Sequence, residues 1–366
     1  VQADQLKESM GQNTLVFNLD TALRMMGDVA EFYVDNEVRN HYFVSISGYH
    51  IAEAGANPIS QAALTLSNGL TYVELFNSRG LDANKFLRNF SWFFSNGMDP
   101  EYAVIGRVCR RIWAIAMRDM YGVDERGQKL KYHIQSSGRS LHAQEYTWND
   151  YRTTLQALYA LADNANSLHT NSRDEAFGTP TEDTVRDAVA IQLILSKEYG
   201  WLQNENPLQG SHVADWLTDS VEEEILKIFE EMHRRGGVLG ALEVNYQRNR
   251  IQDESMIYEH RKHSGELPII GVNTFEEGVD NSLSVEEFDI EVTRSDKEER
   301  MMVIDRNKAF KETHAKEAEE GLARLKKVAR EGGNLFEVMM DIVEYCTVGQ
   351  VTQALFETGG KFRRNM

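Results

Sequence analysis

Between residues 1 and 275, short strand-like segments alternate with longer segments of helical periodicity. The strand candidates are a clipped first one, VQAD (1–4), and then FVSISGYH (43–50), FSWFFSNG (90–97), LKYHIQSSG (130–138) and NSLHTN (166–171). Between them, stretches such as 22–36 and 102–122 carry apolar residues at helical spacing. Strands separated by helices in this way are typical of a parallel sheet with crossover helices. We therefore expect an α/β fold of the barrel type.

The strand candidates are polar on one face. Because side chains alternate across a strand, Ser45 and Ser47 share a face, and the other strands repeat this pattern with Ser91, Phe93 and Ser95, with His133, Gln135 and Ser137, and with Ser167, His169 and Asn171. An ordinary parallel barrel fills its interior with valine, isoleucine and leucine. If the polar faces point inward here, they leave room along the axis for an extended, hydrogen-bonding ligand. The alternative is that these serines pack against backbone where strand and helix meet, and the pattern alone leaves both open.

Composition restricts the kinds of partner. The 366 residues carry a net charge of −18, which argues against broad nucleic-acid binding but allows a small polyanion held by a few arginines. No apolar run could span a membrane and the first ten residues lack a secretory pattern, so we expect a cytoplasmic protein. Cys109 and Cys346 have no partner motif, which favours reduced, structural thiols and no metal site. P-loop, HExxH and GxSxG motifs do not occur, so the corresponding hydrolase classes are not supported.

The composition changes after residue 275. Residues 276–295 are polar and are predicted to form a linker, whereas 296–330 are highly charged and favour a helix with a solvated face over a partner-binding one. The next helix candidate, 335–357, is apolar enough to require a buried face, either on the barrel or on another subunit. We therefore expect 296–366 to form a helical region that makes a dimer or inter-domain contact.

Several long motifs occur in an order that resembles one enzyme family. They are VQADQLKE (1–8), SISGYHIAEAGA (45–56), HIQSSGRSLHAQE (133–145), SLHTNSRDEA (167–176), PIIGVNTF (268–275) and QALFETGGKFRRNM (353–366). The chain resembles the substrate barrel of the adenosylcobalamin-dependent acyl-CoA mutases, especially the isobutyryl-CoA mutase branch in its fused form. The resemblance implies that 1–275 are the C-terminal portion of a TIM-type (β/α)8 barrel, cut within the barrel and followed by a mainly helical region.

The family's reaction is a carbon-skeleton rearrangement, and the resemblance implies roles in it for individual residues. His50 would hydrogen-bond the thioester carbonyl oxygen, and Tyr49 would press on the adenosyl group. Hydrogen leaves the substrate's methyl group, the thioester carbonyl group migrates to the neighbouring carbon, and hydrogen returns. The resemblance further implies that the cofactor is contacted by Glu53, His133, Gln135, Asn171 and Glu175.

Two glutamines match positions near the acyl group. Gln2 matches a glutamine beside the thioester, and Gln12 stands where methylmalonyl-CoA mutases carry an arginine that pairs with a substrate carboxylate. A neutral glutamine cannot balance that buried charge, so the resemblance favours isobutyryl-CoA, interconverted with n-butyryl-CoA. The alternatives are methylmalonyl-CoA mutase, another acyl-CoA mutase, and a non-catalytic module for coenzyme A binding or dimerisation. The intact Tyr49–His50 pair favours a working mutase.

Contacts with the nucleotide portion of coenzyme A are implied for Ser91 and Arg126. The family often has an arginine two residues before this serine, whereas Asn89 stands there with Arg88 adjacent, so the phosphate contact departs from the pattern. The DxHxxG cobalamin motif and a P-loop do not occur in these 366 residues. The resemblance therefore implies that adenosylcobalamin is held mainly by another domain of the same polypeptide, that GTP and Mg²⁺ belong to a fused GTPase domain if one is present, and that the protein is a homodimer.

Overall fold

A parallel four-stranded sheet lies at the centre of the described part of the molecule, a computed structural model that describes residues 3–12, 14–276 and 294–363. Its strands are hydrogen-bonded in the order β1 (Val44–Ser47), β2 (Phe90–Asn96), β3 (Tyr132–Ser136) and β4 (Ser167–His169). Each strand lies inside its predicted segment, so the predicted α/β class is confirmed. The strand predicted over residues 1–4 is wrong for Ala3 and Asp4, which belong to no strand and lead directly into a helix. Residues 1–2 lie outside the described residues.

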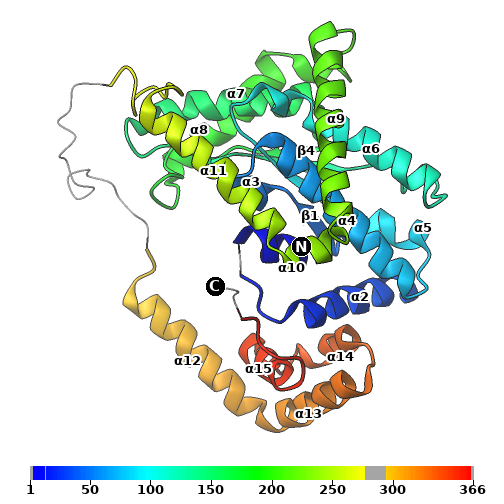
Figure 1. The fold of residues 1–366 in the computed structure, drawn as a ribbon. Coiled ribbons are helices and arrows are strands. Elements are labelled where there is room, and N and C mark those ends of the chain that lie inside the picture. Colours follow the sequence, from blue (N-terminus) through cyan, green and yellow to red (C-terminus); the bar gives the residue numbers. More distant parts are fainter. Residues whose placement is uncertain (1–2, 13, 277–293, 364–366) are drawn as a thin grey trace.

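Helices connect the strands and cover one face of the sheet (Figure 1). In the barrel portion they are α1 (Gln5–Lys7), α2 (Leu19–Asp35), α3 (Tyr49–Glu53), α4 (Pro58–Ser78), α5 (Ala83–Phe86), α6 (Ile105–Asp119), α7 (Asn149–Ala162), α8 (Glu182–Leu193), α9 (His212–His233), α10 (Gly237–Glu243) and α11 (Tyr246–Ser264). Short 3₁₀ turns are η2 (Leu87–Asn89), η3 (Pro100–Ala103), η4 (Gly138–Ser140), η5 (Tyr146–Trp148) and η7 (Trp201–Gln203), and π turns are η1 (Glu8–Gln12) and η6 (Ile194–Glu198). Helix α4 packs on β1, and α7 packs on the other three strands.

The two faces of the sheet differ as the alternation predicts. The face under the helices is made of apolar side chains at most 1% exposed, namely Val44, Ile46, Trp92, Phe94, Tyr132 and Ile134. Each such side chain contributes about 1.5–3 kcal/mol through burial, so this face fixes which way the strands point. The opposite face carries half-buried or exposed polar residues, which are Ser45, Ser91, His133, Gln135, Ser167 and His169. The polar groups therefore lie on the side of the sheet away from the packed helices.

The carboxyl end of β1 is held by a buried carboxylate. Asp4 accepts hydrogen bonds from the backbone N–H of Ser47 (3.0 Å), the backbone N–H of Lys7 (3.1 Å) and the hydroxyl of Tyr72 (2.7 Å). Gly48 then allows the turn into α3, because a Cβ there would lie 2.5 Å from the Thr65 hydroxyl oxygen. Helix α3 is thus placed at the end of the polar face.

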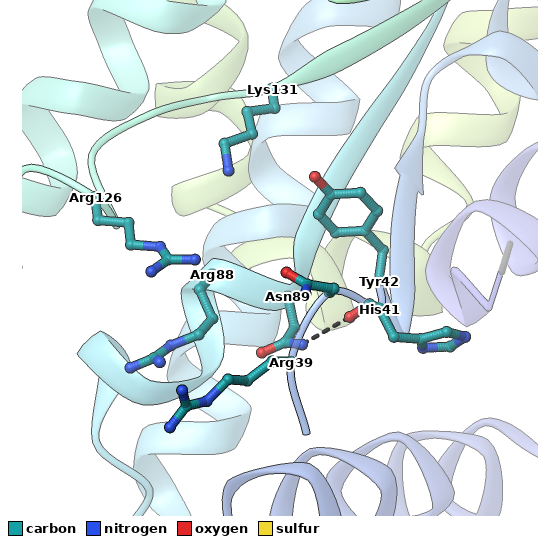
Figure 2. A pocket seen from close by; sticks show the side chains of 8 residues that line it. Arg39, His41, Tyr42, Arg88, Asn89, Arg126 and Lys131 are labelled. Atoms are coloured by element: carbon teal, nitrogen blue, oxygen red, sulfur yellow. Dashed lines mark hydrogen bonds between the residues drawn. The ribbon is translucent and has the colours of Figure 1, made fainter. Parts of the chain in front are cut away.

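The amino ends of the strands meet around a pocket (Figure 2). Its lining comes from residues just before β1, β2 and β3, including Tyr42, Asn89 and Lys131. The two ends of the polar face therefore carry different structures, a short helix at one end and a pocket at the other.

The C-terminal region forms α12 (Lys297–Thr313), α13 (Ala315–Glu331), α14 (Leu335–Ile342) and α15 (Val348–Gly359). Helices α13, α14 and α15 share a small hydrophobic core, whereas α12 buries no side chain, as expected for a solvated helix. The single apolar helix predicted over 335–357 is wrong. A capping box between Thr347 and Gln350 starts a new helix there.

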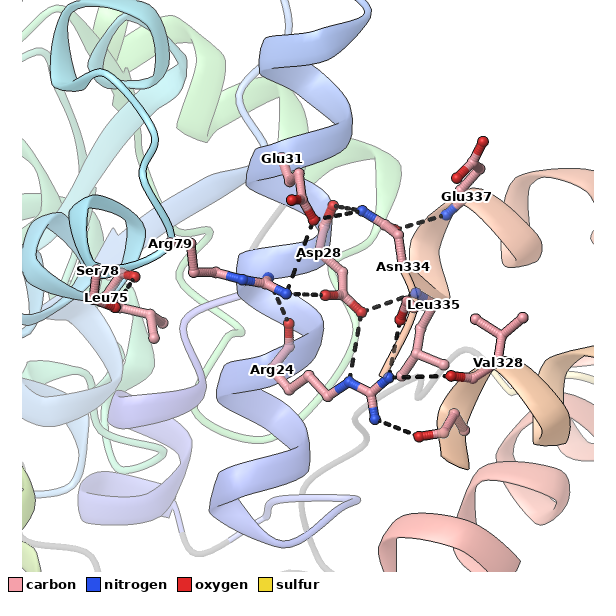
Figure 3. A network of polar contacts seen from close by, with 12 residues as sticks. Arg24, Asp28, Glu31, Leu75, Ser78, Arg79, Val328, Asn334, Leu335 and Glu337 are labelled. Atoms are coloured by element: carbon pink, nitrogen blue, oxygen red, sulfur yellow. Dashed lines mark hydrogen bonds and ion pairs between the residues drawn. The ribbon is translucent and has the colours of Figure 1, made fainter. Parts of the chain in front are cut away.

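This region docks on α2 of the barrel portion through a buried carboxylate (Figure 3). Asp28 pairs with Arg79 at 2.6 Å and accepts from the backbone N–H of Leu335 at 2.9 Å. Arg24 donates to the carbonyl oxygens of Ala329 and Gly333 at the end of α13. The apolar helix α14 thus finds its buried face on the barrel portion. The predicted linker, 276–295, falls almost entirely outside the described residues.

Within the described ranges, no helix combines the length and apolar character needed to cross a membrane.

Candidate active site

Tyr49 and His50 are the first two residues of α3 and stand at the carboxyl end of β1. The Tyr49 ring stacks on Phe93 of β2 with centroids 4.8 Å apart and planes 6° from parallel. His50 is held differently, because its Nδ1 lies 2.8 Å from the hydroxyl oxygen of Ser47. Both rings are therefore fixed by neighbours that belong to the strands themselves.

His50 is neutral at physiological pH. Burial is the main reason that its pKa falls to about 4, and the positive charge of Lys7 lowers it further while Glu8 opposes the shift. The Ser47 hydroxyl can donate to Nδ1, which leaves Nε2–H as a hydrogen-bond donor. The ring can thus stabilise a developing negative charge on an oxygen without itself carrying a charge.

Glu53, one turn further along α3, joins the ends of three strands. It accepts hydrogen bonds from the hydroxyl of Ser95 (3.0 Å), the hydroxyl of Ser137 (2.7 Å) and the backbone N–H of Arg139 (2.8 Å). Burial raises the pKa of Glu53, and these hydrogen bonds oppose the rise. Two of the serines that the sequence placed on the polar face, Ser95 and Ser137, therefore donate to Glu53 at the carboxyl end of this face.

Asn171 and Glu175 gather around the same point. Asn171 receives a hydrogen bond from Gln135 Nε2 (2.9 Å) and donates through its own Nδ2 to the Ser136 carbonyl oxygen (2.8 Å). A Cβ added to Gly138 would lie 3.3 Å from Glu53 Oε2 and 3.8 Å from both Asn171 Nδ2 and Glu175 Cγ. Burial and the nearby Glu53 raise the pKa of Glu175. Carboxylates and amides around a glycine offer the acceptors and donors that vicinal hydroxyl groups need.

His133, a further predicted residue, lies on the polar face of β3. His133 Nδ1 lies 2.8 Å from the Ser167 hydroxyl oxygen, and its ring centroid is 5.2 Å from that of Phe93. Burial lowers the pKa of His133, which favours the neutral ring. His133 therefore continues the line of uncharged hydrogen-bonding groups from His50 toward the amino end of the sheet.

The pocket at the amino end has a volume of about 420 Å³ and is cationic. Its lining residues are Arg39, Asn40, His41, Tyr42, Arg88, Asn89, Arg126 and Lys131, and none of these described residues is acidic (Figure 2). Arg39 pairs with Glu37 at 3.4 Å at the exposed rim. The Nε of Arg88 is buried and has no hydrogen-bond partner within the described chain. Several cations and one unpaired donor suit a phosphorylated ligand.

The departure at Asn89 has a structural explanation. Its Nδ2 donates to the carbonyl oxygens of His41 (2.7 Å) and Val38 (3.3 Å), so Asn89 braces the loop before β1. Ser91, two residues later, donates to the Val44 carbonyl oxygen (3.3 Å) and faces the polar side of β2. Arg88, the residue before Asn89, lines the pocket.

The pocket and the Tyr49–His50 pair lie at opposite ends of the polar face. Strand β2 spans seven residues, and at about 3.3 Å per residue this separates the ends by about 20 Å. Only an extended ligand can contact both ends.

The two predicted acyl-group residues are placed less completely. Gln12 is exposed on η1, and its Oε1 lies 3.3 Å from Lys7 Nζ. Gln2 lies outside the described residues. Sequence reasoning placed Ser47 on the polar face but gave it no role in the site, and it missed Arg39, Lys131 and Lys7. The signal for Ser47 is its position three residues before His50, within reach of the ring. The signal for Lys131 is that it directly precedes β3, as Asn89 directly precedes β2.

Fold and site define an α/β protein with a polar sheet face, which has a cationic pocket at its amino end and a Tyr–His pair at its carboxyl end. The chain belongs to the methylmalonyl-CoA mutase family, whose family model matches residues 1–361. This confirms the family expected from the motifs. No group of three or more His, Cys, Asp or Glu side chains suited to a metal occurs in the described part.

Within this family, the chain is more similar to some mutases than to others. The chain is 60% identical over its whole length to a fused isobutyryl-CoA mutase of Nocardia farcinica and 60% identical to one of Geobacillus kaustophilus, and in both cases it covers 34% of the relative. It is 34% identical to the large subunit of 2-hydroxyisobutanoyl-CoA mutase of Aquincola tertiaricarbonis, with 99% of the chain and 64% of the relative covered. The chain thus spans about a third of the length of the fused relatives.

Proposed function

We propose that this chain forms the acyl-CoA-binding part of a radical mutase that interconverts isobutyryl-CoA and n-butyryl-CoA. The observation that carries this proposal is the pairing, on one polar sheet face, of a neutral His50 with a cationic pocket about 20 Å away. An acyl-CoA thioester is an extended molecule with phosphates at one end and a carbonyl oxygen at the other. The identity with fused isobutyryl-CoA mutases supports this choice among acyl-CoA enzymes.

At the thioester end, His50 would donate from Nε2 to the carbonyl oxygen. Negative charge or spin density that develops there as the group migrates is stabilised by a donor that is already held in place by Ser47. Gln2 would contribute near the same oxygen. At the other end, Arg88, Arg126 and the hydroxyl of Ser91 would hold the nucleotide portion.

Adenosylcobalamin, when bound, would supply the radical chemistry that removes and returns the substrate hydrogen. The residues present fit its adenosyl group, because Glu53, Asn171 and Glu175 surround Gly138 with hydrogen-bonding groups suited to ribose hydroxyls. Tyr49 would press on that group from its stacked position on Phe93. His133 and Gln135 would line the same side, and the Tyr49–Phe93 stack helps to exclude water.

Gln12 would select the acyl group. Its carboxamide carries no charge, so Gln12 would give no counter-ion to a substrate carboxylate enclosed beside it, and an enclosed, unpaired carboxylate costs several kcal/mol. This favours isobutyryl-CoA over methylmalonyl-CoA.

The remainder of the polypeptide would complete the enzyme. Because the chain covers about a third of the fused relatives, we place the main cobalamin contacts, and GTP and Mg²⁺ in a GTPase domain, outside these residues. We propose a homodimer that involves the helical region 296–366, with 1–275 as the acyl-CoA-binding domain and 276–295 as the linker. A cytoplasmic location agrees with two free, buried cysteines.

The test is to incubate the full-length protein with adenosylcobalamin and isobutyryl-CoA and to follow n-butyryl-CoA. We expect isomerisation with a clear preference over methylmalonyl-CoA. A preference for methylmalonyl-CoA would overturn the substrate, and binding without turnover of either thioester would favour a non-catalytic module.

A further inference from the structure

Lys7 is almost completely buried beside the candidate site, an unusual position for a lysine. Its side chain is 3% exposed, and its Nζ lies 2.5 Å from Glu8 Oε1 and 3.3 Å from Gln12 Oε1. An ammonium group has three donors and no acceptor, so the Gln12 atom that faces it is the oxygen. The Nε2 amino group of Gln12 therefore points away from Lys7.

The local backbone makes this contact possible. Residues Glu8–Gln12 form the π turn η1, in which positions five apart come close together, whereas in an α-helix they point to different sides. The same turn packs against α3, because a Cβ on Gly11 would lie 3.5 Å from the His50 carbonyl oxygen. Glu8 also accepts a hydrogen bond from the Thr14 hydroxyl on the far side of Gln12. The turn that carries Gln12 thus packs against the helix that carries His50.

We propose that Lys7 is a positioning residue that holds Gln12 by its carboxamide oxygen, so that an uncharged donor faces the acyl group, while Glu8 neutralises the cation. This inference rests on the proposed function, in which Gln12 selects the acyl group. Its consequence is that Lys7, although it lies beside Gln12, offers no free positive charge to the acyl group. A carboxylated acyl group is then disfavoured for two reasons. Gln12 carries no charge, and the ammonium group of Lys7 is already paired with Glu8.

A second effect of the pair reaches His50. The charge of Lys7 lowers the pKa of His50 and the charge of Glu8 raises it, whereas burial makes the largest contribution. Removing the Lys7 charge should therefore raise the pKa of His50, and removing the Glu8 charge should lower it further.

The experiment is a double-mutant cycle in the full-length holoenzyme. Lys7→Met, Gln12→Ala and the double variant are compared for kcat and KM with isobutyryl-CoA, and for thioester affinity by calorimetry. We expect Lys7→Met to raise KM about tenfold, the usual effect of losing one charge-assisted hydrogen bond, with a smaller change in kcat. In the Gln12→Ala background the same change should alter KM less than twofold. Equal effects in both backgrounds would overturn the proposal.

Two further variants separate positioning from folding. Lys7→Arg should restore most of the lost affinity, whereas Lys227→Met, which removes an exposed lysine 2.7 Å from Glu224, should change nothing. If Lys7→Met does not fold, as judged by circular dichroism, Glu8→Gln replaces it. That variant should raise the kcat/KM ratio of methylmalonyl-CoA to isobutyryl-CoA at least fivefold, and an unchanged ratio would contradict the proposal. If the wild-type protein shows no isomerisation, the proposed function fails separately, and the calorimetric cycle still tests Lys7.

Discussion

The two ends of the polar sheet face differ in their electrostatics. At the carboxyl end, Tyr49, His50 and Glu53 are half-buried, and burial keeps His50 uncharged. At the amino end, the pocket gathers three arginines and a lysine with no acidic lining residue. The difference shows that one strand pattern can supply an uncharged histidine donor at one end and a cationic pocket at the other. The cations of the pocket are carried by the segments that flank the strands, and not by the strands. The predictions below change one end, or a region away from both ends, and test whether the function of the unchanged parts is affected.

The largest effect is expected at His50. His50→Ala should reduce kcat by a factor on the order of 10²–10³, the usual loss for one donor to a developing oxyanion, with little change in KM. His50→Gln, which keeps a neutral donor, should lose less. Steady-state kinetics with isobutyryl-CoA measure both, and His212→Ala, an exposed histidine at the start of α9, is the control. Near-normal turnover of His50→Ala would refute the role assigned to this residue.

The amino end should show the opposite split. Replacing Arg88 and Arg126 together with alanine should raise KM on the order of 10- to 100-fold and leave kcat within about threefold, because these residues would hold phosphates far from the reacting atoms. The KM of the wild-type protein should rise with salt more steeply than that of the variant. Arg118→Ala removes an exposed arginine that pairs with Asp119 and is the matched control. A loss confined to kcat would contradict the anchoring role.

The pH dependence tests the neutral end directly. The pKa of His50 is about 4, below the ordinary histidine value, so the ring stays uncharged as the pH falls from 8 to about 5. We expect the pH profiles of kcat/KM for the wild-type protein and for His50→Gln to be the same near pH 6.5, because His50 does not ionise there. An ionisation near pH 6.5 that disappears in His50→Gln would mean that His50 gains a proton at its ordinary pKa and that burial does not govern it.

The smallest kinetic effect is expected away from both ends, at Asp28. Asp28→Ala leaves Arg79 without its buried partner and removes the acceptor of the Leu335 N–H, which should weaken docking of α14 by about 3 kcal/mol. Hydrogen exchange of peptides from α14 should accelerate on the order of 100-fold while kcat and KM stay near normal. Glu230→Ala, which breaks an exposed pair with Arg234, should change exchange little. Unchanged exchange in α14 would show that this network does not hold the helical region.

The sequence predicted the sheet well because its signal is local. Alternation on 43–50 and 130–138 fixes which residues share a face, and this survives any arrangement of the helices. It could not show that Ser95 and Ser137 meet on Glu53, since that contact depends on the order of strands. The break at Thr347 was readable as a capping box but was hidden by the apolar residues on both sides.

The cationic pocket was harder to foresee. Arg126 was expected near the nucleotide, but Arg39 lies in the connection before β1 and Lys131 in the connection before β3, and the convergence of these two connections is a property of the folded sheet. The partner of Gln12 was missed for a related reason, because a five-residue spacing does not bring side chains together in an α-helix and does so in the π turn.

The central claim is that one extended thioester contacts both ends of the face, and a truncated substrate tests it most directly. Isobutyryl-pantetheine keeps the thioester and lacks the nucleotide. The wild-type protein, the double variant Arg88→Ala/Arg126→Ala and His50→Ala are each assayed with isobutyryl-CoA and with isobutyryl-pantetheine. We predict that the arginine variant has a raised KM for isobutyryl-CoA and a normal KM for isobutyryl-pantetheine. His50→Ala should lower kcat by the same factor on the two substrates. A KM defect of the arginine variant that persisted with isobutyryl-pantetheine would contradict the account.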